Sequence, residues 1–339
     1  MSDRGGDEAI AALGVWRIPV PIPFPQAGGP VNVVAVEEEG GGVALFDSGL
    51  GTPEAEAAVV AGLAARGHGF ADVRRLFVTH GHVDHYGLAE KIRTASGAQV
   101  FVHPADRWKV AGSAQWRERE PRMRAFLESA GAPADAIAIM MRVGEAQEQR
   151  FAARLPTDIG SLHEGQRLRF AKCEAEVLHM PGHTPGLVCA RLEPLRGGGP
   201  IVLVADDYLI EKTSPNPILE IFDDGTRFRA LPTYFASLAR VEAMALDWIV
   251  PGHGACFPEH RAVIASLRSF YERRQEKLLA LIPPEGATPV DLVRAIFPQA
   301  RPFDLFLMIG EILGNLDVLE DAGRVRCSEE GGRLRYLRS

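Results

Sequence analysis

The sequence has few cysteines, and they lie far apart. Cys173, Cys189, Cys256 and Cys327 are the four cysteines among 339 residues, and no two of them form a CxxC pair. Disulfide-held secreted domains and zinc sites built from thiolates both need closely patterned cysteines. The spacing therefore argues against both, and it favours the reducing environment of the cytoplasm.

The sequence also lacks a long apolar run and an excess of positive charge. No hydrophobic stretch approaches the roughly 18–20 residues that cross a bilayer, and the acidic start over residues 1–14 has neither the basic nor the apolar region of a signal peptide. The formal net charge is −7, whereas proteins that bind nucleic acid usually carry a basic patch. We therefore expect a soluble, cytoplasmic protein with no membrane partner, and the charge argues against a nucleic-acid partner.

Hydrophobic residues make up 46% of the chain, which suffices for one large domain or two modest ones. In the first half, short apolar runs end in Gly, Pro or Asn, a pattern typical of buried strands. It predicts strands at residues 31–36, 43–46, 75–78 and 99–102. Helices are expected at residues 52–66, where Thr52 can cap the helix and Pro53 suits its first turn, and at residues 84–94.

The pattern changes between residues 105 and 157, where strand signals vanish and Arg, Glu, Met and Ala dominate. We expect two or three helices there, inserted into a strand-rich framework. Strand signals return at residues 174–179, 187–191, 201–205 and 248–250, with a helix near 232–245. After residue 258 the pattern predicts helices at 259–282, 289–296 and 304–321, followed by a β-hairpin at 324–337. The expected division is one domain over residues 15–258 and a second segment over 259–339.

The strongest local signal is the segment 79–85, Thr-His-Gly-His-Val-Asp-His, directly after an expected buried strand. His80 and His82 lie two positions apart, so in an extended segment both imidazoles point to the same side. Asp84 and His85 follow where the chain turns into a helix. Four ligand-type residues within six positions fit metal binding better than a surface loop that happens to be rich in histidine.

Further polar residues follow four other expected strands. Asp47, His183 and His253 each stand at such a strand end, and so do the adjacent Asp206 and Asp207. Glycines beside the two histidines allow the backbone to turn sharply and to bring a side chain close to a ligand. Any one of these motifs alone is more often a turn than a site. Together with the histidine-rich segment, they predict a metal centre formed by strand-end loops.

In this order and combination, the motifs resemble the metallo-β-lactamase superfamily over about residues 15–254, and its glyoxalase II-like and lactonase-like branch in particular. The resemblance implies an α/β fold, a four-layer αββα sandwich whose strand-end loops surround one or two metal ions. Residues 15–258 would then be the catalytic domain, with the helical insert at 105–157. The three helices and hairpin of residues 259–339 resemble the winged-helix-like tail of some relatives.

Carried over position by position, the resemblance implies two sets of metal ligands. The first metal would be held by His80, His82 and His183, and the second by Asp84, His85 and His253. Asp206 resembles the bridging carboxylate, although the family commonly has Gly-Asp where this chain has Ala205-Asp206, and the adjacent Asp207 leaves some ambiguity of register. Asp47 resembles the aspartate that orients ligands without binding metal.

The ligand set indicates the chemistry. Nitrogen and oxygen donors without thiolate suit Zn²⁺ best and also admit Mn²⁺, Fe or Ni²⁺. Two such cations that share a water lower its pKa from 15.7 to about 7, so a metal-bound hydroxide can attack a carbonyl or phosphorus centre. Asp84 is the expected catalytic residue, because it can accept a hydrogen bond from the hydroxide and later move a proton to the leaving group. We therefore predict a dinuclear-metal hydrolase that cleaves an ester, thioester or lactone of a small molecule.

Three alternatives stay open. An RNA phosphodiesterase of the same fold would need a basic groove, whereas residues 259–339 carry balanced charge. An iron-dependent sulfur dioxygenase usually relies on a single iron, whereas this chain has ligands for two metals. A non-catalytic metal-binding protein would be expected to have lost ligands, and none is lost here. A small-molecule substrate and a homodimeric assembly complete the expectations about partners.

Overall fold

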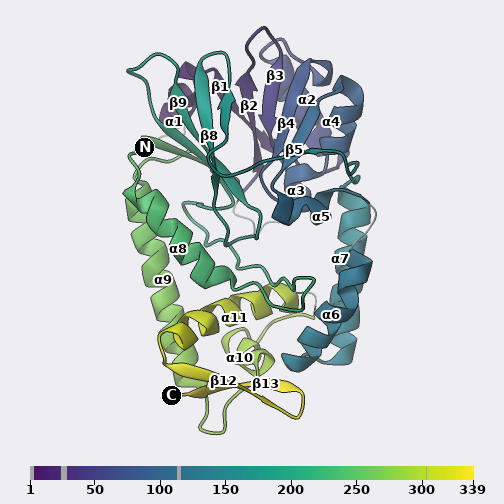
Figure 1. The fold of residues 1–339 in the computed structure, drawn as a ribbon, viewed down its shortest axis with the longest axis vertical. Helices are drawn as coiled ribbons and strands as arrows, with labels where there is room; N and C mark the ends of the chain where they lie inside the picture. Colours follow the sequence, from purple (N-terminus) through teal and green to yellow (C-terminus); the bar gives the residue numbers. More distant parts are fainter. Residues whose placement is uncertain (1–3, 24–28, 113–115, 303) are drawn as a thin grey trace.

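The computed structural model describes residues 4–23, 29–112, 116–302 and 304–339 (Figure 1). A six-stranded sheet has the order β1-β2-β3-β4-β5-β6, and a five-stranded sheet has the order β11-β10-β9-β8-β7. The first sheet consists of β1 (Val15–Val20), β2 (Val31–Glu37), β3 (Val43–Phe46), β4 (Val73–Val78), β5 (Gln99–Val102) and β6 (Gly160–Ser161). The second consists of β7 (Arg167–Arg169), β8 (Cys173–His179), β9 (Val188–Pro194), β10 (Val202–Asp206) and β11 (Trp248–Pro251).

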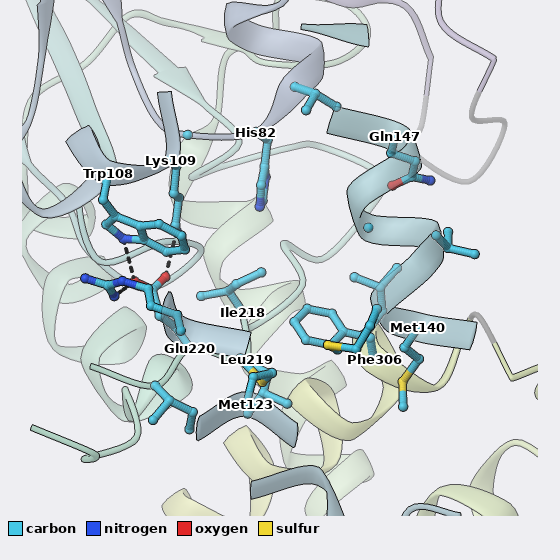
Figure 2. Close-up of a pocket in the computed structure, with 18 of the residues that line it drawn as sticks. His82, Trp108, Lys109, Met123, Met140, Gln147, Ile218, Leu219, Glu220 and Phe306 are labelled. Carbon is cyan, nitrogen blue, oxygen red and sulfur yellow. Dashed lines mark hydrogen bonds and ion pairs between the residues drawn. The ribbon is translucent and has the colours of Figure 1, made fainter. Parts of the chain in front are cut away.

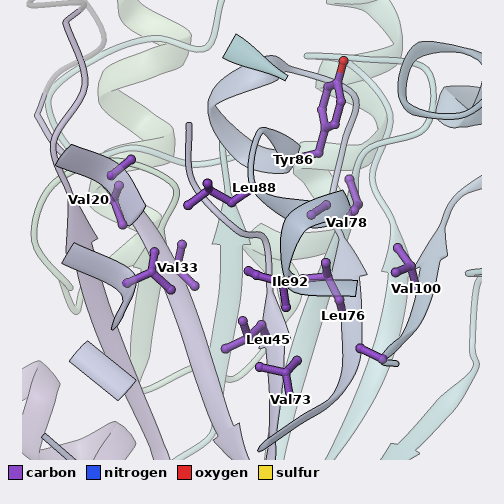
Figure 3. Close-up of a cluster of buried hydrophobic side chains, with 14 of the residues drawn as sticks. Val20, Val33, Leu45, Val73, Leu76, Val78, Tyr86, Leu88, Ile92 and Val100 are labelled. Carbon is purple, nitrogen blue, oxygen red and sulfur yellow. The ribbon is translucent and has the colours of Figure 1, made fainter. Parts of the chain in front are cut away.

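The two sheets pack face to face, and helices cover their outer faces. Phe46 and Phe77 of the first sheet share one buried cluster with Val177 and Val204 of the second. Helices α2 (Pro53–Ala64) and α4 (Ala89–Ser96) cover the first sheet, and Figure 3 shows Ile92 of α4 beside strand residues of that sheet. Helices α8 (Ala230–Ala243) and α9 (His260–Leu281) cover the second. This four-layer αββα sandwich is the predicted fold.

Local signals placed most elements correctly, but one expected helix is divided into two in the structure. Helix α2 begins as predicted, because the Thr52 side chain accepts a hydrogen bond from the backbone N–H of Ala55 over 3.2 Å. The single helix expected at residues 84–94 is instead two helices, α3 (Val83–Tyr86) and α4. The break falls at Gly87, where a Cβ would overlap the backbone of Gly51 and Phe151. Close packing of distant segments therefore interrupts a locally helical pattern.

Two N-terminal elements were not predicted, helix α1 (Arg4–Ala12) and strand β1. Strand β1 contains Pro19, which pairs in register with Asn32 of β2. Proline has no N–H for a sheet and is tolerated at an edge, and β1 is the edge strand of the first sheet. The proline-rich composition concealed this strand.

The insert and the C-terminal segment share one hydrophobic core. The insert contains a short 3₁₀ helix η3 (Pro104–Asp106) and helices α5 (Arg107–Val110), α6 (Trp116–Ser129) and α7 (Ala134–Phe151). After α9 come α10 (Pro289–Ile296), α11 (Leu305–Asp321) and the hairpin of β12 (Val325–Glu330) and β13 (Arg333–Arg338). Leu127 and Ile137 of the insert lie in the same buried cluster as Ile309 and Leu313 of α11. In Figure 1, α6, α7, α10, α11 and the hairpin lie below the sandwich, whereas α5 lies beside α3 at the lower end of the first sheet.

The remaining short element is the 3₁₀ helix η2 (Phe70–Asp72), which precedes β4. Within the described ranges, no helix has the length and apolar character needed to cross a bilayer.

Candidate metal centre

Loops at the ends of five strands converge on one buried site. Asp47 follows β3, the segment with His80 follows β4, His183 lies between β8 and β9, Asp207 follows β10, and His253 follows β11. All five of these side chains are buried. Residues from positions 47 to 253 therefore meet, as the sequence motifs predicted for a strand-end site.

Three histidines form the first ligand cluster. Nδ1 of His82 lies 3.0 Å from Nε2 of His80 and 2.9 Å from Nε2 of His183. Nitrogen ligands lie about 2.0–2.1 Å from a tetrahedral zinc ion, so atoms this close can share one cation. Oδ2 of Asp207 adds an oxygen 3.5 Å from Nε2 of His183 and 4.0 Å from Nε2 of His80. These four residues form a group able to hold a metal ion.

Asp84, His85 and His253 form a second such group. Oδ2 of Asp84 lies 3.8 Å from Nε2 of His85 and 3.6 Å from Nε2 of His253. Asp207 also reaches this group, with Oδ2 3.5 Å from Nε2 of His85 and Oδ1 3.4 Å from Nε2 of His253. Its carboxylate therefore lies between the two clusters.

The structure places Asp206, the residue expected as the bridging carboxylate, outside the space between the two clusters. Oδ1 of Asp206 lies 3.2 Å from Nδ1 of His80 and 3.3 Å from Nδ1 of His85, behind the nitrogens that face the clusters. Its backbone has φ of 51°, a left-handed conformation that favours glycine. The geometry therefore favours Asp207 over Asp206 as the carboxylate between the two clusters.

Hydrogen-bond acceptors on the outer side of four histidines determine which ring nitrogen of each faces the candidate metal centre. Nδ1 of His183 lies 3.0 Å from the carbonyl oxygen of Asn216, and Nδ1 of His253 lies 3.3 Å from that of Gly29. A carbonyl oxygen can only accept, so these Nδ1 atoms carry protons and the Nε2 lone pairs point inward. Carboxylate oxygens play the same part for the other two histidines. Oδ1 of Asp206 lies 3.2 Å from Nδ1 of His80, and Oδ2 of Asp47 lies 2.8 Å from Nδ1 of His85.

Asp47 is itself held rigidly. The backbone N–H and the hydroxyl of Thr79 each donate to it over 2.8 Å. Thr79 precedes the first histidine of the motif, so Asp47 positions both ends of the segment from Thr79 to His85. This placement agrees with the orienting role that the resemblance implies.

The electrostatics of the first cluster favour neutral histidines. Burial and the neighbouring His183 and His80 lower the pKa of His82 well below 6.5. Burial lowers the pKa of His183 to about 4. Metal ligation requires the neutral imidazole, so these side chains are ready to bind a cation at neutral pH.

The second cluster has an excess of carboxylate. Burial disfavours the imidazolium of His85, but Asp206, Asp207 and Asp84 raise its pKa well above 6.5. Among the described residues, buried Nε2 of His85 and Oδ1 of Asp207 have no hydrogen-bond partner. Buried polar atoms are rarely left unpaired, and both of these lie at the second cluster, where Oδ1 of Asp207 is 3.4 Å from Nε2 of His253. The donor set therefore fits a bound divalent cation, as the sequence analysis expected.

Asp106 is a supporting residue that sequence reasoning missed. Its buried carboxylate accepts from the backbone N–H of Gly81 over 2.9 Å, the hydroxyl of Thr184 over 2.7 Å and the backbone N–H of Gly186 over 2.9 Å. Burial opposes its ionisation, but Lys109 and these donors lower its pKa below 3.8. Asp106 thus joins the loop of His80 and His82 to the loop of His183.

A cavity of about 370 Å³ opens beside His82 (Figure 2). The insert helices α6 and α7, the segment between β10 and α8, and the start of α11 form its walls. Most of the lining is apolar, and its large apolar side chains include Trp108, Met123, Met140, Met141, Ile218, Leu219, Ile221, Phe306 and Leu307. Substrate sites commonly have this size and composition, so the cavity is the candidate substrate site.

Comparison with known proteins agrees with this geometry. The family model of the metallo-beta-lactamase superfamily matches residues 27–196. A crystal structure of a metallo-beta-lactamase family protein from Thermus thermophilus is 32% identical, covers 96% of this chain and 99% of its own, and has a TM-score of 0.78. A probable metallo-hydrolase of Bacillus subtilis (strain 168) is 27% identical over 324 residues, 94% of this chain and 97% of that protein.

A beta-lactamase domain protein from Burkholderia ambifaria has a TM-score of 0.77 at 22% identity, over 96% of this chain and 92% of its own, and it supports the fold alone. The match to the family model, the relative of 32% identity and the paired His/Asp clusters agree with one another. The chain belongs to the metallo-beta-lactamase superfamily and is a metal-dependent hydrolase.

Proposed function

We propose that the protein holds two divalent metal ions and hydrolyses an ester, thioester or lactone of a small molecule. The observation that carries this proposal is the position of Asp207, whose two carboxylate oxygens lie within 3.4–3.5 Å of nitrogens from both clusters. A carboxylate that spans two cation sites neutralises part of the charge at each. Zn²⁺ suits the mixed nitrogen and oxygen donors.

The residues divide into two ligand sets and one proton carrier. His80, His82 and His183 would hold the first ion, Asp84, His85 and His253 would hold the second, and Asp207 lies where its carboxylate could contact both. Bound divalent ions supply Lewis acidity and make water acidic enough to be a nucleophile near neutral pH. The Asp84 side chain is partly exposed, so it can accept a proton and return it to the leaving group.

An acyl bond is favoured over a phosphodiester by the surroundings of the site. A nuclease must hold a polyanion, and each phosphate contact normally uses a Lys or Arg. The cavity beside His82 is instead mostly apolar, and two of its three basic side chains, Lys109 and Arg119, are paired with acidic ones.

The test combines metal analysis with a substrate screen. Wild-type protein reconstituted with Zn²⁺ or Mn²⁺ should contain close to two ions per chain and should turn over an aryl ester, an acyl thioester or a lactone. Asp207→Asn should lose at least one ion and most of the activity, whereas Asp224→Asn, at an exposed aspartate outside the clusters, should retain both. Saturation at one iron per chain would favour a dioxygenase.

Single-stranded RNA in low salt is the second arm of the screen. Efficient RNA cleavage that His82→Ala abolishes, with no turnover of any acyl substrate, would replace the proposal by a phosphodiesterase.

A further inference from the structure

The cavity beside His82 has the chemistry of a site for one kind of substrate group. We infer that it binds a neutral aliphatic acyl chain, with the carbonyl end at the metal centre. This inference rests on the proposed hydrolysis of an acyl bond and adds the class of acyl group that the site selects.

The shape of the cavity supports this assignment. Figure 2 shows the His82 imidazole projecting into the cavity from the sandwich side. Met123 of α6, Phe306 of α11 and Leu219, which precedes α8, lie across from it. A substrate whose reacting carbon is at the clusters can therefore extend its remaining atoms between these apolar side chains. Methionine adapts to irregular aliphatic shapes because it is unbranched and flexible.

The charges in the cavity wall argue against an anionic or strongly polar group. Nζ of Lys109 lies 2.7 Å from Oε2 of Glu220 and 3.5 Å from Oδ1 of Asp106. Nη2 of Arg119 lies 3.0 Å from Oδ2 of Asp223, and the guanidinium carbon of Arg119 lies 4.2 Å from the centroid of the Trp108 ring.

Arg154, the third basic residue of the lining, donates to the backbone carbonyl oxygens of Trp108 and Ala111 over 3.1 and 3.3 Å. Lys109 and Arg119 are thus ion-paired and Arg154 is hydrogen-bonded within the chain, although Nη1 of Arg119 is buried without a hydrogen-bond partner among the described residues. An anionic substrate group would have to compete with these contacts, whereas an uncharged hydrocarbon chain leaves all of them in place.

The experiment measures chain-length dependence in two independent ways. Hydrolysis of p-nitrophenyl esters from acetate to tetradecanoate is measured with the zinc-loaded enzyme. Binding of primary alcohols from butanol to decanol to the metal-free protein is measured by titration calorimetry. We expect both kcat/KM and affinity to rise about four-fold per methylene until the cavity is full, and kcat/KM to fall for longer chains.

Two cavity variants and one matched control locate the effect. Met123→Trp should shift the preferred chain to a shorter length, and Phe306→Ala should shift it to a longer one. Met308→Trp is the control, because Met308 is also a partly buried methionine packed on the shared core but does not line the cavity. It should leave the preferred length unchanged.

The outcomes separate this inference from the proposed function. Ester hydrolysis that is independent of chain length, or a preference that both cavity variants leave unmoved, would overturn the inference and leave the proposed function standing. Absence of hydrolysis for every acyl substrate, with length-dependent alcohol binding that Met123→Trp weakens and Met308→Trp does not, would overturn the proposed function and keep the cavity as an aliphatic site.

Discussion

Replacing Asp106 should destabilise the protein more than replacing any ordinary surface aspartate. Its carboxylate accepts hydrogen bonds from Gly81, Thr184 and Gly186, and it faces Lys109. A hydrogen bond to a charged group contributes about 1.5–3 kcal/mol, and a buried donor left without a partner costs about 1–3 kcal/mol. Since such terms overlap, we expect Asp106→Ala to lower the free energy of unfolding by about 4 kcal/mol.

The assay is urea unfolding of the metal-free protein, followed by circular dichroism. Asp106→Asn should lower the free energy of unfolding by about half as much as Asp106→Ala, because the amide oxygen still accepts a hydrogen bond but the NH₂ group faces a donor. Asp72→Ala is the control, since Asp72 accepts the N–H of Gly69 over 2.8 Å at the start of η2, and its loss should cost about 1 kcal/mol. If Asp106→Ala lost no more than Asp72→Ala, the carboxylate would not be what joins the two ligand loops.

The same residue should make stability depend on acid. The pKa of Asp106 is lower in the folded chain than its ordinary value of 3.8. Its contribution is therefore complete above about pH 4 and is lost as the pH falls through the folded value. The difference in stability between wild type and Asp106→Ala should shrink below pH 4, and a difference that grew there would contradict the direction of the pKa shift.

Three further predictions concern the site and its surroundings. Asp207→Asn should lower metal content and kcat more than Asp206→Asn, as measured by elemental analysis and initial rates. The reverse order would favour Asp206 as the bridging carboxylate. Chelation should lower the midpoint of thermal unfolding, because metal at a thousand times its Kd adds about 4 kcal/mol to the stability of the folded state; an unchanged midpoint would contradict the fit of the clusters to metal. Burial, together with the stacked His179 ring, lowers the pKa of His103 from 6.5 to about 4. Between these two pH values the folded state binds fewer protons than the unfolded state, so the wild type loses stability as the pH falls from 6.5 to about 4. His103→Phe should reduce that slope in thermal unfolding followed from pH 7 to pH 4, and an unchanged slope would assign the effect to other groups.

The sequence predicted what depends on local pattern. The proline and capping threonine of α10, the glycine turn of the last hairpin and the strand ends that carry histidines are all set by residues close together in the chain. Strand ends on one side of a sandwich must meet, so the convergence of the two clusters was also predictable.

Features that depend on distant contacts could not be predicted in this way. The choice between Asp206 and Asp207 depends on which carboxylate lies between the two clusters after the backbone turn at Asp206, and composition does not reveal this. Asp106 is a single aspartate whose partner Gly186 lies 80 residues away. The break at Gly87 exists because the backbones of Gly51 and Phe151 come close to it.

The contribution of α11 to the cavity has a consequence for biosynthesis. Phe306 is translated more than two hundred residues after His82, and domains generally fold as units from the N-terminus while the chain is made. On the ribosome the sandwich can therefore gather its metal ligands while the cavity still lacks one wall. Substrate selection would begin only when the last helices leave the exit tunnel and close against the insert, so the order of synthesis separates assembly of the metal centre from completion of its specificity.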